Sequence, residues 1–525
     1  MPPRPALSAD RSAIPPLTEF VLAAALGACA SLPFVHTWAW WVQIGLFALV
    51  AARVGRAGPG RAAAIGVAFG TAWLAAGTWW LYISMHRYGG LPAVLAVAAV
   101  AVLSVCLSLY AAAAFALFAR WKSGRPGIDA LRFAALWLLA ELARGVIFTG
   151  FPWIETAYAQ VDGPLAALAP WVGAYGIGAV VAGLGAWLGL PRAGGWRAWR
   201  RPAGITALLL VAPAVSGPGS FTEASGTLSV TLLQNNVPQD EKFNAEHLPE
   251  ELDWTRRQLL AAPGDLVVGP ETVIPLLPDQ LDPAYWQTIA RHFRTGRQSA
   301  LIGLPLGNED IGYTNSAAGL SDRTANLPGG FYRYDKHHLV PFGEFIPNGF
   351  HWFTRMMNIP LGDFNRGPLA APSFEVRRRD GGIERVAANI CYEDLFGEEL
   401  AARFTDAATA PTLFANISNI GWFGDTIAVE QHLQISRLRT LEFQRPMIRA
   451  TNTGPTVVID HRGQVVAALK PYTQAVLDAV VQGRTGLTPY AWWVARTGLW
   501  PWLVLAVVVL WPAWRAARAA TGRRL

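Results

Sequence analysis

The chain has 525 residues, of which 52% are hydrophobic and only 15% are charged, and its formal net charge is +7. A soluble protein of this length carries about 25% charged residues, so the composition argues against a wholly soluble chain. The charge deficit is local. It falls in residues 1–216 and 490–525, whereas residues 225–485 have the composition of an ordinary globular domain.

Long apolar runs predict helices that cross a bilayer, since such a helix needs about 20 apolar residues. The first two candidates are separated only by a short break near Pro33, and the seventh is short. The eight predicted spans are residues 17–33, 37–54, 62–83, 91–119, 128–148, 166–190, 203–216 and 495–516. An even number of spans places both termini on the same side of the membrane.

Basic residues indicate which side that is, because Lys and Arg favour cytoplasmic loops. With eight spans, nearly all basic residues outside the large domain fall on one face, and the opposite short loops carry little beyond Arg87. We therefore expect cytoplasmic termini and an exported domain. Residues 217–490 carry a charge of −7 and the rest of the chain +14. The basic residues are scattered over loops and a tail, which predicts no nucleic-acid partner.

One charged pair lies inside the fifth predicted span. Glu141 and Arg144 are three residues apart and therefore share one face of a helix. Charged side chains inside a membrane are costly and are retained for function or as structural locks. We expect a structural lock, with a phospholipid head group as the alternative partner.

From residue 228 strand-like and helix-like segments alternate. The predicted strands are 228–234, 265–271, 299–307, 385–393, 411–418, 446–453 and 456–460, and the predicted helices are 244–262, 282–296 and 427–443. This alternation predicts an α/β sheet fold whose faces are covered. Reactive groups in such folds gather at the carboxyl ends of strands.

Three polar residues follow predicted strands of the outer domain. Glu271 ends "DLVVGPE", Lys336 ends "GGFYRYDK" and Cys391 ends "RVAANIC". The other two cysteines of the chain lie in predicted spans, so Cys391 has no partner thiol in its domain. A single thiol in an exported domain is either reactive or buried and inert.

The segments "GPETVIP", "YDKHHLVPFGEFIP" and "NICYEDLFG" resemble the Glu–Lys–Cys signature of the nitrilase superfamily. Together with the predicted spans, they make the chain similar to the apolipoprotein N-acyltransferase family of the bacterial inner membrane. The resemblance runs from about residue 17 to residue 516. It also includes the segments "ELARGVIFTGFPW", "LLQNNVPQ", "NISNIGWFGD" and "QHLQISRLRTLEFQRPMIRATNTG".

This resemblance implies a polytopic membrane protein that carries an α/β nitrilase-like domain with an α-β-β-α sandwich. Residues 1–216 would form about seven transmembrane helices, residues 217–490 a periplasmic catalytic domain, and residues 491–525 a last helix and a cytoplasmic tail. It also implies a ping-pong transfer. An acyl chain leaves a phospholipid, typically phosphatidylethanolamine, to form a thioester on Cys391, and then passes to the α-amino group of a diacylglyceryl-cysteine that begins an apolipoprotein. No cofactor is expected.

The chemistry suits these residue types. A free thiol titrates near pH ~8.5 and needs a base or a cation to act at neutral pH. Glu271 would take the proton, and Lys336 would stabilise the thiolate and, with the backbone N–H of Tyr392, the oxyanion. The resemblance assigns a supporting role to Glu344, a second carboxylate that would lie beside Lys336 and keep its ammonium group charged and oriented. Glu393 would either steer the acceptor amine or hold the turn.

Aromatic residues suggest contacts with lipid. Trp422 and Phe423 lie in a loop that would either enter the lipid interface or pack as an ordinary loop. The apolar stretch 341–362 is predicted to be a lid over a lipid-binding cleft. Members of the resembled family often have Trp where this chain has Phe243, so a contact that needs an indole N–H is in doubt.

Three other interpretations of the chain are a metal-binding protein, a hydrolase and a transporter. A metal site built from His337, His338 and His432 is rejected, because adjacent residues on an extended segment point to opposite faces and no ligand set has zinc spacing. A membrane-tethered amidase would use the same three groups with water as the acceptor. A transporter with a degenerate enzyme domain would lack one of those groups and would carry more intramembrane charges.

Overall fold

The computed structural model describes residues 17–192, 195–347 and 364–522. Its contacts divide the chain into two compact units. A helical unit contains the chain up to Trp79, Val97–Pro218 and the chain from Leu499 onward. An α/β unit contains Gly219–Gly498 together with the segment Trp80–Ala96.

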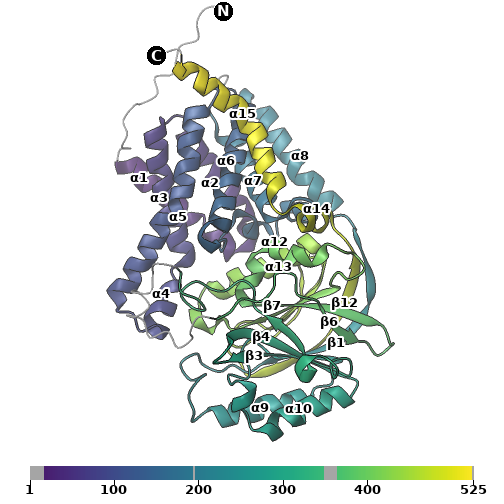
Figure 1. The fold of residues 1–525 in the computed structure, drawn as a ribbon. Helices are drawn as coiled ribbons and strands as arrows, with labels where there is room; N and C mark the ends of the chain where they lie inside the picture. The colour runs from purple at the N-terminus through teal and green to yellow at the C-terminus, as the bar shows by residue number, and fades with distance from the viewer. Residues whose placement is uncertain (1–16, 193–194, 348–363, 523–525) are drawn as a thin grey trace, which may run out of the picture. The chain divides into compact units, whose positions relative to one another are not determined.

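Helices coincide with all eight predicted spans (Figure 1). They are α1 (Leu17–Cys29), α2 (Trp40–Val54), α3 (Pro59–Thr78), α5 (Ala93–Trp121), α6 (Pro126–Val146), α7 (Ala169–Gly189), α8 (Arg200–Ser216) and α15 (Trp500–Gly522).

Within the described ranges, five helical segments are long and apolar enough to cross a membrane: those around α1, α2, α5, α7 and α15. A sixth results if α3 and the bent continuation Leu81–Tyr88 count as one span. The two other predicted spans are helical too, but α6 carries four charged side chains and α8 has only 17 residues. The unit is therefore a polytopic helical domain, as predicted.

Small residues let the helices of this unit approach closely, as is usual in membrane bundles. A Cβ at Gly27 of α1 would lie 2.0 Å from the carbonyl oxygen of Phe69 in α3. A Cβ at Gly189 of α7 would lie 1.9 Å from the carbonyl oxygen of Ala48 in α2. Glycine is therefore required where α1 crosses α3 and where α2 crosses α7.

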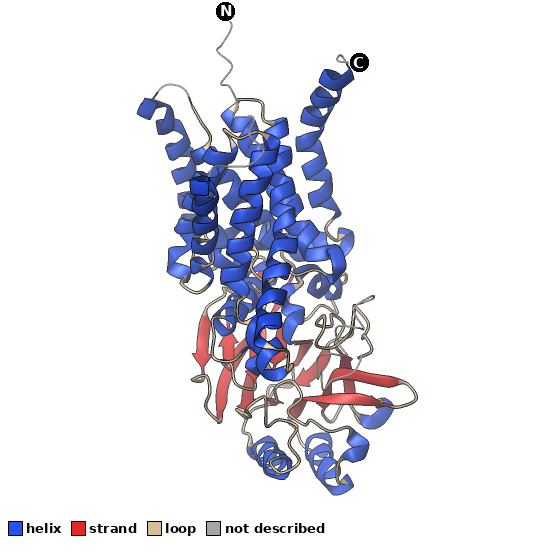
Figure 2. Cartoon of the chain, turned by 90° about the vertical axis from the view of Figure 1, so that its left-hand side faces the viewer, coloured by secondary structure: helices blue, strands red, loops and turns tan. Residues whose placement is uncertain are grey.

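Within the described residues the strands, red in Figure 2, all belong to the α/β unit. They form two six-stranded sheets. The first sheet has the order β12-β1-β2-β3-β4-β5 and the second β11-β10-β9-β8-β7-β6. Their bounds are β1 Thr222–Gln234, β2 Leu266–Val268, β3 Ser299–Asn308, β4 Gly312–Leu320, β5 Tyr332–Asp335, β6 Phe374–Arg377, β7 Ile383–Ile390, β8 Leu413–Ser418, β9 Met447–Thr451, β10 Val457–Ile459, β11 Val465–Ala468 and β12 Ala475–Gly486.

Three layers of apolar contacts hold this unit together. One cluster fills the space between the two sheets. A second lies between the first sheet and helices α9 (Leu248–Ala261) and α10 (Pro283–Thr295), and a third lies between the second sheet and helices α12 (Gly397–Ala401), α13 (Ala428–Phe443) and α14 (Pro489–Thr497). Figure 1 shows α9 and α10 on one side of the strands and α12 and α13 on the other. The predicted α-β-β-α sandwich is confirmed.

The predicted strands and helices are present, but some bounds differ. The strand predicted over 265–271 ends at Val268, where Gly269 and Pro270 interrupt the pattern, and the strand predicted over 385–393 ends at Ile390. The strand expected in "GGFYRYDK" is β5, and four strands were not predicted: β4, β6, β11 and β12. Strand β4, "GYTNSAAGL", is buried along most of its length, yet its small residues give no apolar run.

Candidate active site

The three residues predicted to act together follow strands of both sheets. Glu271 lies three residues beyond β2, Lys336 directly follows β5, and Cys391 directly follows β7. The Lys336 Nζ atom lies 3.6 Å from Glu271 Oε1. Both charged groups are close enough to Cys391 to shift the pKa of its thiol. The fold therefore brings a carboxylate, an amine and a thiol to one place.

Cys391 opens a short 3-10 helix, Cys391–Leu395, with a positive φ of 52°. Residues other than glycine rarely adopt this conformation, and the surrounding structure must hold it. The Cys391 carbonyl accepts hydrogen bonds from Asn416 Nδ2 and His432 Nε2, both at 3.2 Å. These two side chains fix the turn on which the thiol sits.

The pKa of Cys391 is raised to about 12, because burial and the Glu271 carboxylate raise it by more than Lys336 and Ser418 lower it. At neutral pH the resting thiol therefore keeps its proton. A base must remove this proton while the sulfur attacks, because the thiolate and not the thiol is the nucleophile.

Lys336 is the cation of the site and is only 1% exposed. Its Nζ atom donates to Glu344 Oε1 at 2.8 Å, which is the contact expected between these two residues. Burial works against the charged form, but the carboxylates of Glu344 and Glu271 raise the pKa of Lys336 above its usual value. The group is therefore an ammonium ion at any physiological pH.

Both oxygens of Glu271 accept hydrogen bonds. Asn315 Nδ2 donates to Oε1 at 2.7 Å, and the backbone N–H of Asn419 donates to Oε2 at 2.8 Å. The same Asn315 Nδ2 also donates to Glu344 Oε1 at 2.7 Å, so one amide bridges the two carboxylates beside Lys336. Sequence reasoning missed Asn315, which lies on the unpredicted strand β4.

Glu393 is fully engaged in holding the turn. Its Oε2 accepts from Tyr334 Oη at 2.7 Å and from the backbone N–H of Ile390 at 2.6 Å, and its Oε1 accepts from the N–H groups of His337 and His338. A carboxylate has about four acceptor positions, and the protein uses them all. This favours the structural alternative over steering of an amine.

Tyr392 has a buried ring that packs against His338 and Phe396. The side chain is thus committed to the hydrophobic interior. What this residue can offer the reaction is its backbone N–H.

A buried polar network that the sequence did not reveal supports Cys391 from α13. His432 Nε2 contacts Asp394 Oδ1 at 2.9 Å as well as the Cys391 carbonyl, and His432 Nδ1 faces Arg449 Nη2 at 3.0 Å. Since Arg449 can only donate, Nδ1 is the acceptor and Nε2 carries the proton. Ser436 completes the network with a hydrogen bond to Asp394.

The other two histidines that were considered as metal ligands have protein partners. His337 Nδ1 lies 2.8 Å from the Gly367 carbonyl, and His338 Nδ1 lies 2.9 Å from Glu399 Oε1. Among the residues that the structure describes, no group of three or more His, Cys, Asp or Glu side chains is arranged to hold a metal.

The aromatic loop packs within the α/β unit, which is one of the two alternatives that the sequence left open. Trp422 and Phe423 are half-buried. The Trp422 ring meets Tyr88 edge-on at 5.8 Å, and the Phe423 ring lies 4.3 Å from that of Trp80. Trp80 and Tyr88 belong to the segment of the α/β unit that comes from the N-terminal part of the chain, which no local pattern could reveal.

Other predicted lipid contacts differ in exposure. Phe243 is 44% exposed, in a turn after β1. The predicted lid over 341–362 lies mostly outside the described residues, including Phe350, Trp352, Phe353, Met356 and Met357. Phe345 is described, and its ring lies 5.1 Å from the Arg366 guanidinium.

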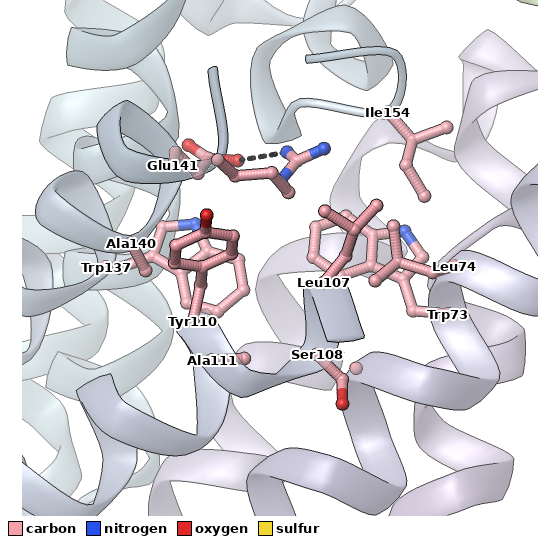
Figure 3. Close-up of a pocket in the computed structure, with 12 residues that line it drawn as sticks. Trp73, Leu74, Leu107, Ser108, Tyr110, Ala111, Trp137, Ala140, Glu141 and Ile154 are labelled. Carbon is pink, nitrogen blue, oxygen red and sulfur yellow. Dashed lines mark ion pairs between the residues drawn. The ribbon is translucent and has the colours of Figure 1, made fainter. Parts of the chain in front are cut away.

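The Glu141–Arg144 pair of the helical unit lines a small cavity of about 20 Å³, enough for one water molecule. Figure 3 shows Glu141, Tyr110 and Trp137 around this cavity. Glu141 Oε1 accepts from the N–H and the hydroxyl of Thr156, and Arg144 Nη1 donates to the Phe151 carbonyl at 3.0 Å.

Thr156 and Phe151 belong to the connection between α6 and α7, which contains only short 3-10 helices and is largely buried. Irregular backbone at membrane depth requires such internal partners. The cavity has no room for a head group, and the pair fastens the connection, as expected of a lock.

Two family models match the chain. The model of the apolipoprotein N-acyltransferase N-terminal domain matches residues 23–187, and that of carbon-nitrogen hydrolase matches residues 230–490. The apolipoprotein N-acyltransferase of Verminephrobacter eiseniae is 51% identical over 506 residues, which are 91% of this chain and 93% of the relative. That of Ralstonia nicotianae is 45% identical and covers 95% and 94% of the two chains, and that of Bordetella bronchiseptica is 42% identical and covers 88% of each.

Proposed function

The chain belongs to the apolipoprotein N-acyltransferase family, and from this premise we propose that it transfers an acyl chain through a thioester on Cys391. The enzyme is an acyltransferase of the nitrilase superfamily, with a lipid as acyl donor and a lipoprotein as acceptor. The observation that carries the catalytic assignment is the convergence of the buried Glu271 carboxylate, the buried Lys336 ammonium and the partly exposed Cys391 thiol in one site.

In the first half-reaction, Cys391 Sγ attacks the ester carbonyl carbon of a phospholipid, for which we propose phosphatidylethanolamine. Glu271 takes the thiol proton as the S–C bond forms. Lys336 and the backbone N–H of Tyr392 stabilise the oxyanion. The C–O bond then breaks, the lysophospholipid alkoxide takes the proton back from Glu271, and the acyl group stays on sulfur.

In the second half-reaction, the neutral α-amino group of the diacylglyceryl-cysteine attacks the thioester carbonyl. Glu271 accepts a proton from the attacking amine, the C–S bond breaks, and the thiolate recovers that proton. The products are an amide and the free thiol, so no oxidant or reductant is needed. A thioester suits this exchange because it is reactive enough to acylate an amine.

The remaining parts of the proposal concern topology and supporting residues. Residues 217–490 would lie in the periplasm, with residues 1–216 and 491–525 forming the membrane part and both termini in the cytoplasm. Support comes from the distribution of Lys and Arg between the predicted loops. Phe243, Trp422 and Phe423 are proposed to contact the acyl chains, since all three are at least partly accessible and belong to the α/β unit.

An amidase that uses water as the acceptor is the second candidate, and the same three groups would support it. It fits less well with relatives that are named as acyltransferases over nearly their whole length. A tethered hydrolase also requires only a single membrane helix as its anchor, whereas a binding site for a phospholipid at the level of the bilayer needs several.

Intact mass measurement of the purified full-length chain tests the proposal. Mixing with phosphatidylethanolamine vesicles should add the mass of one acyl chain, and hydroxylamine should remove it. The Cys391→Ala variant should gain nothing, whereas Cys29→Ala and Cys106→Ala should behave like the wild type. The acylated enzyme should persist until an acceptor lipopeptide is added. Rapid loss of the acyl group to water would favour the amidase instead.

A further inference from the structure

Lys242 is a buried lysine of the α/β unit, and the mechanism above does not use it. It lies in the turn between β1 and α9 and is only 2% exposed, although the neighbouring Phe243 is 44% exposed. Its Nζ atom donates a hydrogen bond of 3.0 Å to the main-chain carbonyl of Glu271. Long charged side chains are almost never buried to this extent without a specific partner.

Glu271 lies on a loop whose backbone is held tightly. The next residue, Thr272, has a positive φ of 51°. Strand β3 passes so close beneath this loop that a Cβ at Gly303 would lie 2.3 Å from the Pro270 carbonyl oxygen. A strained backbone of this kind persists only where neighbouring groups hold it in place.

Three donors then fix the three oxygens of Glu271. Asn315 binds Oε1, the N–H of Asn419 binds Oε2, and Lys242 binds the main-chain carbonyl. The first two set the direction of the carboxylate, and the third sets the position of the backbone from which it extends. A base misplaced by about 1 Å can cost roughly 100-fold in rate.

We propose that Lys242 is a positioning residue of the acyl transfer, whose ammonium group holds the main chain of Glu271 and thereby aims the carboxylate at the Cys391 thiol. The inference rests on the proposed function, because it assigns to Glu271 the role of base. Lys242 itself touches neither substrate nor the reacting sulfur in this role.

The charge of Lys242 makes this role sensitive to pH. The pKa of Lys242 is lowered to about 8, because burial lowers it by more than the ionisable groups that face it, Glu271, Glu251 and Cys391, raise it. Glu251 comes from α9, and its pKa is raised to about 7, because burial raises it by more than Lys242 lowers it. The positive charge of Lys242 is therefore present below about pH 8 and is lost above it. A neutral amine donates a hydrogen bond roughly half as strong as an ammonium does.

The test compares Lys242→Met, which removes the charge, with Lys242→Arg, which keeps a charge that cannot be titrated below about pH 12. Lys470→Met is the matched control, because Lys470 is exposed, at a turn after β11. The full-length enzyme is mixed with phosphatidylethanolamine vesicles without acceptor, and the initial rate of Cys391 acylation is measured from pH 6 to 10.

We expect Lys242→Met to acylate Cys391 at least tenfold more slowly at pH 7, with no further fall near pH 8. The wild-type and Lys470→Met rates should fall above about pH 8, and the Lys242→Arg variant should keep its rate to higher pH. A wild-type rate in Lys242→Met, or the same alkaline fall in Lys242→Arg as in the wild type, would overturn the inference.

Two further measurements keep the outcomes separate. Alkylation of Cys391 by iodoacetamide over the same pH range reports the effect of Lys242 on the thiol without any lipid substrate, and Tm identifies a variant that has lost its fold. If the wild type is alkylated but never acylated, the proposed function fails. If the wild type is acylated and the Lys242 variants match it at every pH, only the positioning role fails.

Discussion

Replacing Glu344 by glutamine should slow the first half-reaction while leaving the substrate-binding surface unchanged. Lys336 Nζ contacts Glu344 Oε1 at 2.8 Å and Glu271 Oε1 at 3.6 Å, so Glu344 is its closer carboxylate. A hydrogen bond to a charged group is worth about 1.5–3 kcal/mol, which corresponds to a rate loss of roughly 10- to 150-fold if the bond serves the transition state. The Glu271 carboxylate remains and keeps Lys336 charged, which is why complete inactivation is not expected.

The amide also alters the local hydrogen bonding. Glu344 Oε1 accepts from Lys336 and Asn315, and Oε2 accepts from the N–H of Val340 at 2.8 Å. An amide can keep only one of these two oxygens, so either Val340 or both Lys336 and Asn315 lose their acceptor. Asn315 also donates to Glu271, so the substitution disturbs the surroundings of both Lys336 and Glu271.

The assay for Glu344→Gln is hydroxylamine-sensitive labelling of Cys391 with a phospholipid donor and no acceptor. Glu384→Gln is the control, because Glu384 is fully buried and paired with Arg378 at 2.5 Å but has no contact with Lys336. Removing one partner of a buried pair costs about 3–5 kcal/mol of stability in general, so both variants should lower Tm. Only Glu344→Gln should slow acylation of the enzyme that remains folded. A wild-type rate in Glu344→Gln, or an equal loss in Glu384→Gln, would refute the assigned role.

His432→Asn should remove the donor at Nε2 and release the Cys391 carbonyl, so that kcat of the first half-reaction falls about threefold to tenfold for a neutral hydrogen bond while KM for the donor stays constant. His432→Gln, whose amide nitrogen reaches the Nε2 position, should recover most of the rate, and equal rates in the two variants would contradict the role of this donor. For the topology, a membrane-impermeant thiol reagent applied to intact spheroplasts should label Cys391. A reporter fused after Leu525 that is active only in the periplasm would contradict the cytoplasmic C-terminus.

The sequence predicted where the three groups of the proposed active site lie, because the position of each is encoded locally. Glu271, Lys336 and Cys391 all stand where a strand pattern stops, and the carboxyl ends of strands gather in α/β folds. The eight apolar runs predicted helices because a segment of about 20 apolar residues is typical of a helix that spans a membrane. Both kinds of signal are contained in about 20 consecutive residues.

The groups that orient the reacting residues carry no such signal. Asn315 lies on a strand of small, polar residues, where no alternation of apolar residues indicates a strand. Lys242 lies in a segment typical of an exposed loop, and only the tertiary structure buries it. The packing of Trp422 depends on Tyr88, which precedes it by more than 300 residues. Burial and long-range partners are properties of the folded chain, so a single sequence cannot supply them.

The high pKa of Cys391 explains why so many buried polar groups surround the site. A thiol with a pKa of about 12 provides almost no standing thiolate at neutral pH, so the enzyme cannot rely on a preformed nucleophile. In the proposed mechanism, proton removal coincides with attack on the ester, and this requires the base and the oxyanion donors to be in position beforehand. Asn315, Asn419 and Lys242 hold the base, and Glu344 holds the cation. In the proposed mechanism, burying these polar groups costs free energy, and in return the base and the cation are held in place before the lipid binds.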